Sequence, residues 1–179
     1  YFSNKFQFNY GLNFIYFDFN PGSIGPLTDE SGINFSQLNK KFAMENSAYF
    51  DVIHKISNKL SMRYGFRINQ FLRLRQGGLQ KYLDNSPVIY DDVLGIYDPA
   101  TPLQDNFDNN SSVFSTYSNI EPRLNISYNF QNQSIKASYN RLNQYLHLIS
   151  NTSSPTPLDI WVPSGPYIKP QKLDQFALG

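Results

Sequence analysis

The feature that most constrains this chain is a strict alternation of side chains between residues 60 and 75. The even positions are apolar except Gln70, and the odd positions are polar, cationic or glycine except Phe71. Successive side chains of a β-strand point to opposite faces of a sheet, so this spacing gives one apolar face and one cationic face. At helical spacing the same residues would mix arginine with leucine on every side. The pattern therefore predicts a β-strand.

The same alternation recurs along most of the chain. We expect strands at residues 6–16, 48–56, 60–75, 119–130, 134–148 and from about 172 to 179. In the fifth of these the apolar phase slips near residues 140–142, which predicts a β-bulge or the point at which the strand leaves a membrane. The expected secondary structure is therefore entirely β.

The connections between these strands alternate between short and long. Short turns are expected at residues 3–5, 57–59 and 131–133, and long polar connections at residues 20–39, 76–112 and 150–171. Compact soluble domains rarely carry several connections this long. Outer-membrane barrels have short periplasmic turns and long extracellular loops. The pattern favours an antiparallel transmembrane β-barrel over the alternative, a soluble β-sandwich whose apolar face forms its core.

The number of strands indicates part of a larger barrel. About six strands are expected, whereas the smallest barrels of this kind have about eight. The chain begins at Tyr1-Phe2 and ends in "DQFALG", and we expect both ends to lie within a longer structure. Residues 1–179 are thus predicted to be one partial barrel domain.

Composition agrees with this class and excludes several functions. Aromatic residues make up 16% of the chain, as the aromatic girdles of a membrane barrel require, and charged residues make up only 16%. With 15 basic and 14 acidic residues, the net charge of +1 gives no indication of a nucleic-acid partner. The absence of cysteine excludes thiolate metal sites and cysteine nucleophiles. No catalytic constellation is present, so we expect no enzyme and no cofactor.

Several segments resemble one protein family, in the same order along the chain. The longest is "SNIEPRLNISYNFQNQSIKASYNRLNQYLHLISNTSSPTPLDIWVPSG", residues 118–165, and residues 167–179 continue it. Residues 45–71 and "FDFNPGSIGP" around Asp18 extend the match. These segments resemble the barrel of TonB-dependent outer-membrane receptors of Bacteroidota-type bacteria, of the group with a carboxypeptidase-like regulatory domain.

The resemblance implies a barrel of about 22 strands with an N-terminal plug, the plug lying outside this sequence. It implies uptake of a siderophore, cobalamin, glycan or peptide across the outer membrane of a Gram-negative bacterium, with energy from TonB. The implied partners are outer-membrane lipid, the protein's own plug, the TonB complex, an extracellular ligand and a surface lipoprotein. The alternatives are a passive porin and a secreted β-sandwich or adhesin module.

Candidate ligand-binding residues lie in the long connections and at the outer ends of strands. They are Arg73, Arg75, Tyr82, Asp91, Asp92, His147 and Trp161. Arg73 and Arg75 end a cationic row, for which we favour pairing with acidic residues of the plug or of neighbouring strands over attraction of an anionic ligand. These two arginines lie nearest the outer end, so they are the better ligand candidates of the row. For Trp161 we favour a packing anchor for its proline-rich connection over a ligand-stacking residue.

The two histidines are not expected to form a metal site. His54 lies on an apolar face next to a turn, which indicates an interfacial residue. His147 lies at the top of a strand, and a metal site there would need further ligands that the sequence does not indicate.

Overall fold

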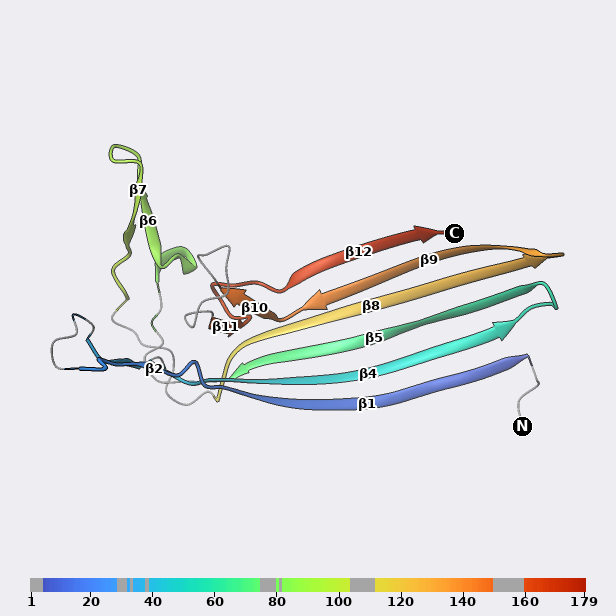
Figure 1. Cartoon of the computed structure of the whole chain (residues 1–179), viewed down its shortest axis with the longest axis horizontal. Coiled ribbons are helices and arrows are strands. Elements are labelled where there is room, and N and C mark those ends of the chain that lie inside the picture. The colour runs from blue at the N-terminus through green and yellow to red at the C-terminus, as the bar shows by residue number, and fades with distance from the viewer. Residues whose placement is uncertain are drawn as a thin grey trace.

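The computed structural model describes residues 5–28, 32, 34–37, 39–74, 80, 82–103, 112–149 and 160–179. Its main element is a six-stranded antiparallel sheet in which every strand pairs with the next along the sequence (Figure 1). The strands in order are β1 (Phe6–Phe19), β4 (Lys41–Lys55), β5 (Leu60–Leu74), β8 (Val113–Phe130), β9 (Gln133–Gln144) and β12 (Gln171–Leu178). All six expected strands are present, and the predicted all-β antiparallel class is confirmed. The sheet is open, with β1 and β12 at its edges.

The long connections contain short ladders that the sequence did not predict. These are β2 (Ser23–Ile24) with β3 (Ser36–Gln37), and β6 (Val88–Asp91) with β7 (Ile96–Pro99). The fifth strand, expected to extend to residue 148, ends at Gln144, and β10 (Leu146–Ile149) forms a separate ladder with β11 (Ile160–Pro163). A 3-10 turn, η1 (Leu83–Asn85), precedes β6. The ladders gather at one end of the sheet, and the β4–β5 and β8–β9 turns lie at the other (Figure 1). No helix among the described residues has the length and apolarity needed to cross a bilayer.

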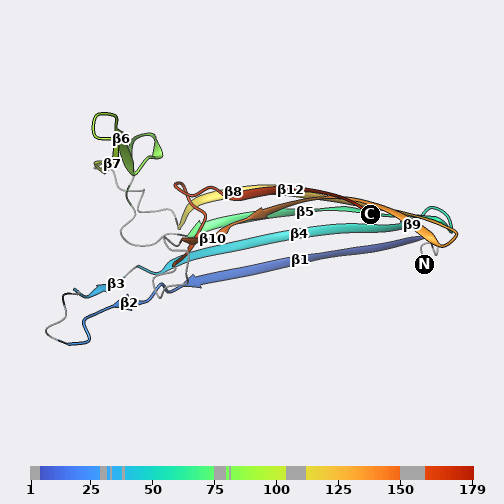
Figure 2. The same cartoon turned by 45° about the horizontal axis from the view of Figure 1, so that its top comes forward.

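One face of the sheet carries apolar side chains on all six strands, and the Arg141–Asp174 ion pair, with 2.7 Å between Nε and Oδ1, lies on the same face near the upper ends of β9 and β12. Cross-strand pairing aligns Phe8, Val52, Tyr64, Leu124, Tyr139 and Phe176 in a single row. Nothing in the described part of the chain covers this face, because Tyr10 is 77% exposed, Leu12 71% and Phe14 70%. Figure 2 shows the long strands running side by side with a gentle curvature. We call the surface that carries this apolar row the apolar face.

The opposite surface, which we call the polar face, carries most of the buried residues of the sheet, whereas Val52, 5% exposed, is buried on the apolar face. Ala43, Phe71 and Tyr145 form a small apolar cluster, with four partly buried side chains packed against it. Those four are Phe17, Phe19, Tyr117 and Leu146. Asp51, Asn69 and Glu121 are also buried there. This arrangement reverses the usual one, in which apolar side chains are buried and polar ones exposed.

The predicted phase slip is present at the upper part of β9. The β8–β9 ladder ends at the Arg123–Asn140 pair, although β12 follows β9 as far as Gln144. The amide N–H of Asn143 donates to the Glu121 carboxylate at 2.9 Å rather than to a backbone carbonyl of β8. As a result Tyr145 packs on the polar face, whereas Tyr139, an even number of residues earlier, lies on the apolar face.

Two glycines let side chains of the polar face lie flat on the sheet. Gly65 pairs with Asp51, and a Cβ at Gly65 would lie 2.3 Å from the Asp51 carboxylate. Gly11 pairs with Tyr49, and a Cβ there would lie 2.7 Å from the Tyr49 ring. The glycines are therefore required by close packing at these two positions.

Candidate functional site

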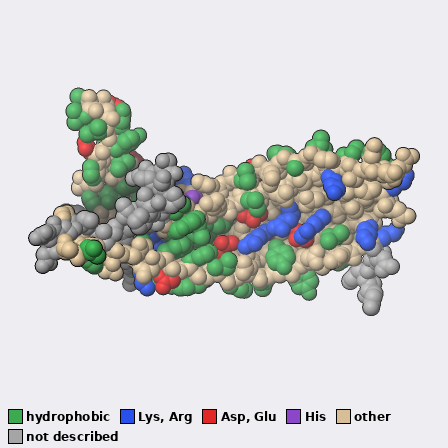
Figure 3. Space-filling view, in the orientation of Figure 1, with side chains coloured by type: hydrophobic (Ala, Val, Ile, Leu, Met, Phe, Trp, Pro, Cys, Tyr) green, Lys and Arg blue, Asp and Glu red, His purple; other side chains and the backbone are tan. Residues whose placement is uncertain are grey.

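An ionic network occupies the middle of the polar face. Asp51, which is 2% exposed, lies between two arginines, with the Arg63 Nη2 atom 3.3 Å from one carboxylate oxygen and the Arg123 Nε atom 3.7 Å from the other. The residues come from β4, β5 and β8, so the network spans three strands. Two cations on one carboxylate leave a net positive charge at this level of the sheet. Figure 3 shows basic and acidic side chains together along this surface.

A second ion pair lies one level higher. The Arg67 Nη2 atom is 3.0 Å from the Glu45 carboxylate, and the Arg67 Nε–H donates to the Asn69 side chain at 2.6 Å. Glu121, on the neighbouring strand, accepts from Asn143. Every carboxylate named on this face has a hydrogen-bonding or ionic partner, which is how charged groups remain stable when they are partly buried.

The β10–β11 ladder folds over the upper end of the polar face. The Tyr145 ring stacks on Phe71 with ring centroids 4.7 Å apart and an interplanar angle of 3°. The Tyr117 hydroxyl donates to the Gly165 carbonyl at 2.7 Å, and the Ser164 N–H donates to the Tyr145 carbonyl at 2.7 Å. The stack on Phe71 thus fixes Tyr145, just before β10, to the sheet, and two hydrogen bonds fix the chain after β11 to Tyr145 and to Tyr117 of β8.

His147 is a buried structural residue of this region. It is 8% exposed, and its Nε2 atom lies 2.9 Å from the Oγ atom of the buried Ser164. Burial lowers the pKa of the His147 imidazole, because the charged form loses solvation. The described residues contain no group of three or more His, Cys, Asp or Glu side chains that could hold a metal ion. His54 stacks on Phe6 with centroids 4.1 Å apart, beside the turn at the opposite end of the sheet.

Of the two arginines predicted to bind a ligand, the structure describes only Arg73. Arg73 is only 4% exposed, and its Nη1–H donates to the Phe42 carbonyl at 3.0 Å. The guanidinium therefore binds the backbone of the neighbouring strand β4 and is not exposed to solvent. Arg75 lies outside the described residues.

Tyr82 joins two of the long connections. Its ring meets the Tyr167 ring edge-on at 5.8 Å, and the Tyr167 hydroxyl donates to the Gln80 carbonyl. Burial, and secondarily Tyr82, raise the pKa of the Tyr167 phenol. The connection after β5 and the connection after β11 therefore meet at this aromatic contact, which places Tyr82 near the upper end of the polar face.

Asp91 and Asp92 lie at the tip of the β6–β7 hairpin. The Asp91 carboxylate accepts from the N–H groups of Val93 and Leu94 at 2.8 and 3.0 Å, which is a turn-stabilising arrangement. Asp92 is exposed. Of these two predicted ligand residues, Asp91 stabilises its own turn and Asp92 faces solvent.

The packing role predicted for Trp161 is wrong. Its side chain is 53% exposed, and it lies opposite Leu148 in the short β10–β11 ladder. The buried residues that follow it are Pro163, Ser164 and Gly165. The proline-rich composition indicated a packed segment, but the sequence did not indicate which residue anchors it.

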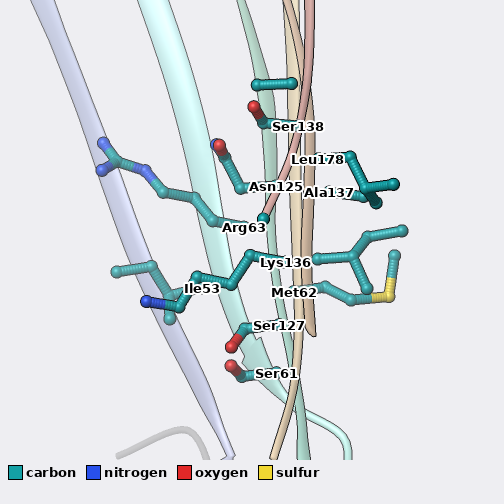
Figure 4. A pocket seen from close by; sticks show the side chains of 13 residues that line it. Ile53, Ser61, Met62, Arg63, Asn125, Ser127, Lys136, Ala137, Ser138 and Leu178 are labelled. Carbon is teal, nitrogen blue, oxygen red and sulfur yellow. The ribbon is translucent and has the colours of Figure 1, made fainter. Parts of the chain in front are cut away.

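A shallow depression of about 430 Å³ lies at the lower end of the polar face, near the short turns. Its polar rim includes Arg63, Asn125, Lys136 and the hydroxyls of Ser61 and Ser127. Figure 4 shows these side chains on one side of the sheet, with Met62 and Leu178 on the other. Sequence reasoning missed this set, because the residues come from separate strands and only the register brings them together.

Comparison with known proteins identified no relative of this chain. No protein-family model matches the chain, no curated protein matches it, and no solved structure matches it.

Proposed function

We propose that this chain is part of a transmembrane β-barrel of an outer-membrane receptor that takes up a large ligand. The observation that carries the proposal is the distribution of side chains on the two faces of the sheet. The apolar face is exposed over all six strands, and the polar face holds paired charges. A barrel wall requires this distribution, with lipid outside and an aqueous lumen inside.

The apolar face is too extensive for a surface in contact with water. Four alternate side chains of β1 alone, Tyr10 to Tyr16, are each at least 60% exposed. Soluble monomers rarely expose contiguous apolar patches larger than a few hundred Å². Hydrocarbon chains of a bilayer would remove this surface from water without a covering layer of protein. The absence of such a layer in the described residues counts against a β-sandwich.

The edges of the sheet support closure by further strands. β1 offers 14 residues and β12 offers 8 residues of backbone along edges where no described strand pairs. Unpaired backbone groups are costly in hydrocarbon, so a spanning sheet must close on itself. We therefore propose that additional strands of the protein complete the barrel.

Strand length fits a wall that extends beyond the membrane. β5 has 15 residues, which at roughly 3.3 Å per residue is about 50 Å of chain. Tilted by about 40°, it would rise about 38 Å, more than the apolar band of about 25 Å in such barrels. Since the short turns lie at one end, the excess length and the long connections would face outward, where a ligand arrives.

The extension to TonB-driven uptake rests on the sequence resemblance of residues 118–165. Under this proposal the ionic network of Asp51, Arg63 and Arg123 lines the lumen and contacts the plug. The upper end of the polar face, with Tyr82 and Trp161, is the part of this chain nearest to an incoming siderophore, cobalamin, glycan or peptide. The protein would catalyse no covalent chemistry.

Fractionation and gel mobility of the full-length protein test the proposal. We expect it in the outer membrane, resistant to carbonate extraction, and migrating faster on gels before heating than after. Recovery of the protein in soluble form without detergent would contradict the barrel. Deletion of TonB should abolish ligand uptake, whereas uptake that persists without TonB would indicate a passive porin.

A further inference from the structure

The β6–β7 hairpin is an apolar element that no other described segment of the chain covers. It stands away from the main sheet, as the two views show (Figures 1 and 2). Ile89 is 61% exposed, Tyr97 69%, Val93 92% and Leu94 66%. A two-stranded hairpin is at best marginally stable alone in water. Contact with another molecule would remove these apolar side chains from water and so stabilise the hairpin.

The charge of this region limits what that molecule can be. Between residues 82 and 103 the acidic side chains are Asp84, Asp91, Asp92 and Asp98, and this stretch contains no lysine, arginine or histidine. A second copy of the hairpin would bring the same four negative charges, which disfavours self-association through this surface. An anionic lipid surface would be repelled for the same reason. The complementary partner is therefore cationic as well as apolar.

The register divides the hairpin into two faces. Tyr90 lies opposite Tyr97, with ring centroids 5.0 Å apart, and Val88 lies opposite Pro99, so one face is apolar. The other face holds Ile89 opposite Asp98 and Asp91 opposite Ile96, so it mixes apolar and acidic side chains. A third strand would place alternate residues against each face.

The two edges of the hairpin differ. Pro99 on β7 has no N–H group, which weakens that edge for strand pairing. β6 contains no proline, and within the described residues it pairs only with β7. The edge of β6 is therefore the better template for an added strand.

We propose that β6 accepts an extended segment of a partner protein whose residues alternate between apolar and basic. The apolar residues would pack beside Val88 and Tyr90, and the basic residues would lie beside Ile89 and Asp91, with Asp98 one strand farther away, across Ile89, on the same face. The added strand would convert a marginal two-stranded hairpin into a three-stranded sheet. This inference goes beyond the proposed function, because it concerns a surface outside the sheet and does not require transport.

A dye-labelled synthetic peptide of eight residues, alternating lysine with valine or leucine, is the probe. Its fluorescence anisotropy is measured with the full-length protein in zwitterionic nanodiscs, and empty nanodiscs give the background. We expect saturable binding that weakens when salt is raised from 50 to 300 mM, as for exposed charge pairs. A scrambled peptide of the same composition and a peptide with glutamate in place of lysine should bind at least about tenfold more weakly.

Two pairs of variants locate the site. Val88→Pro removes an edge N–H and should weaken binding at least about tenfold, whereas Val88→Thr keeps that group and should bind as wild type. Asp98→Asn should weaken binding about threefold and reduce its salt dependence. Asp18→Asn, near the end of β1, should change neither.

The inference would be overturned if the scrambled or the glutamate peptide bound as tightly as the alternating peptide. It would also be overturned if Val88→Pro bound the alternating peptide as wild type does, or if wild type did not bind that peptide at low salt. Failure of these tests leaves the gel-mobility result intact, so the two proposals fail separately.

Discussion

Phe71→Ala is the substitution that best tests how the chain after β11 is held on the sheet. The Phe71 ring is fully buried, stacks on Tyr145, and contacts Phe17 at a centroid distance of 6.4 Å. Deleting a buried phenyl ring costs about 3–5 kcal/mol, and the lost ring stack accounts for about 0.5–1.5 kcal/mol of this. Because Tyr145 begins the β10–β11 segment, we expect the loss to appear there first.

Hydrogen exchange of the full-length protein in nanodiscs measures the effect. The Ser164 N–H, which donates to the Tyr145 carbonyl, reports on docking of this segment. A local loss of about 3 kcal/mol corresponds to roughly a hundredfold faster exchange. Exchange of the Gly95 N–H, which donates to the Asp91 backbone carbonyl in the β6–β7 hairpin, should not change.

Phe66→Ala is the matched control for this experiment. Phe66 lies on the same strand, but on the apolar face, and is 43% exposed. It should leave exchange at Ser164 unchanged. Exchange at Ser164 within threefold of wild type in Phe71→Ala would falsify the view that the Phe71–Tyr145 stack fixes the chain after β11.

Three further substitutions or conditions have defined outcomes. Gly65→Ala should lower the free energy of unfolding by about 1–3 kcal/mol in urea titrations, because its Cβ would collide with the Asp51 carboxylate at 2.3 Å; Gly32→Ala, with no neighbour within 4 Å, is the control. Acidification should destabilise the region around His147: burial lowers its folded-state pKa, so the unfolded chain binds the proton first and stability falls as the pH drops through about 6.5. Its imidazole NMR shifts should titrate below that value, and titration at 6.5 or above would contradict this. Tyr117→Phe removes a 2.7 Å hydrogen bond and should cost about 1 kcal/mol in the same urea titrations, whereas an unchanged midpoint would show that the bond contributes nothing.

The main sheet was predictable because its signal is local. Alternation with a period of two residues identifies a strand and its two faces without knowledge of any partner. Residues 60–75 and 119–130 carry this signal most clearly, and β5 and β8 form there. The phase slip near residue 140 was also visible, because it interrupts a regular pattern.

The candidate site was less predictable because it depends on register and on contacts between distant segments. The pairing of Asp51 with Arg123 requires three strands in one specific alignment. Arg73 is buried where Gly165, in the chain after β11, lies close to it, and no sequence pattern indicates that these two segments meet. Trp161 was misjudged for the same reason, since size and composition suggest an anchor but only packing shows which side chain is enclosed.

The phase slip in the upper part of β9 makes the sheet sensitive to a change in chain length at this one point. Tyr139 faces the apolar side and Tyr145 the polar side, so the residues between them set which surface the remaining chain joins. Deleting one residue there would turn Tyr145 away from Phe71 and expose the cluster beneath it. A deletion of the same size at the β2–β3 tip would leave every long strand in register. Insertions and deletions should therefore be tolerated in the long connections and excluded from residues 140–144.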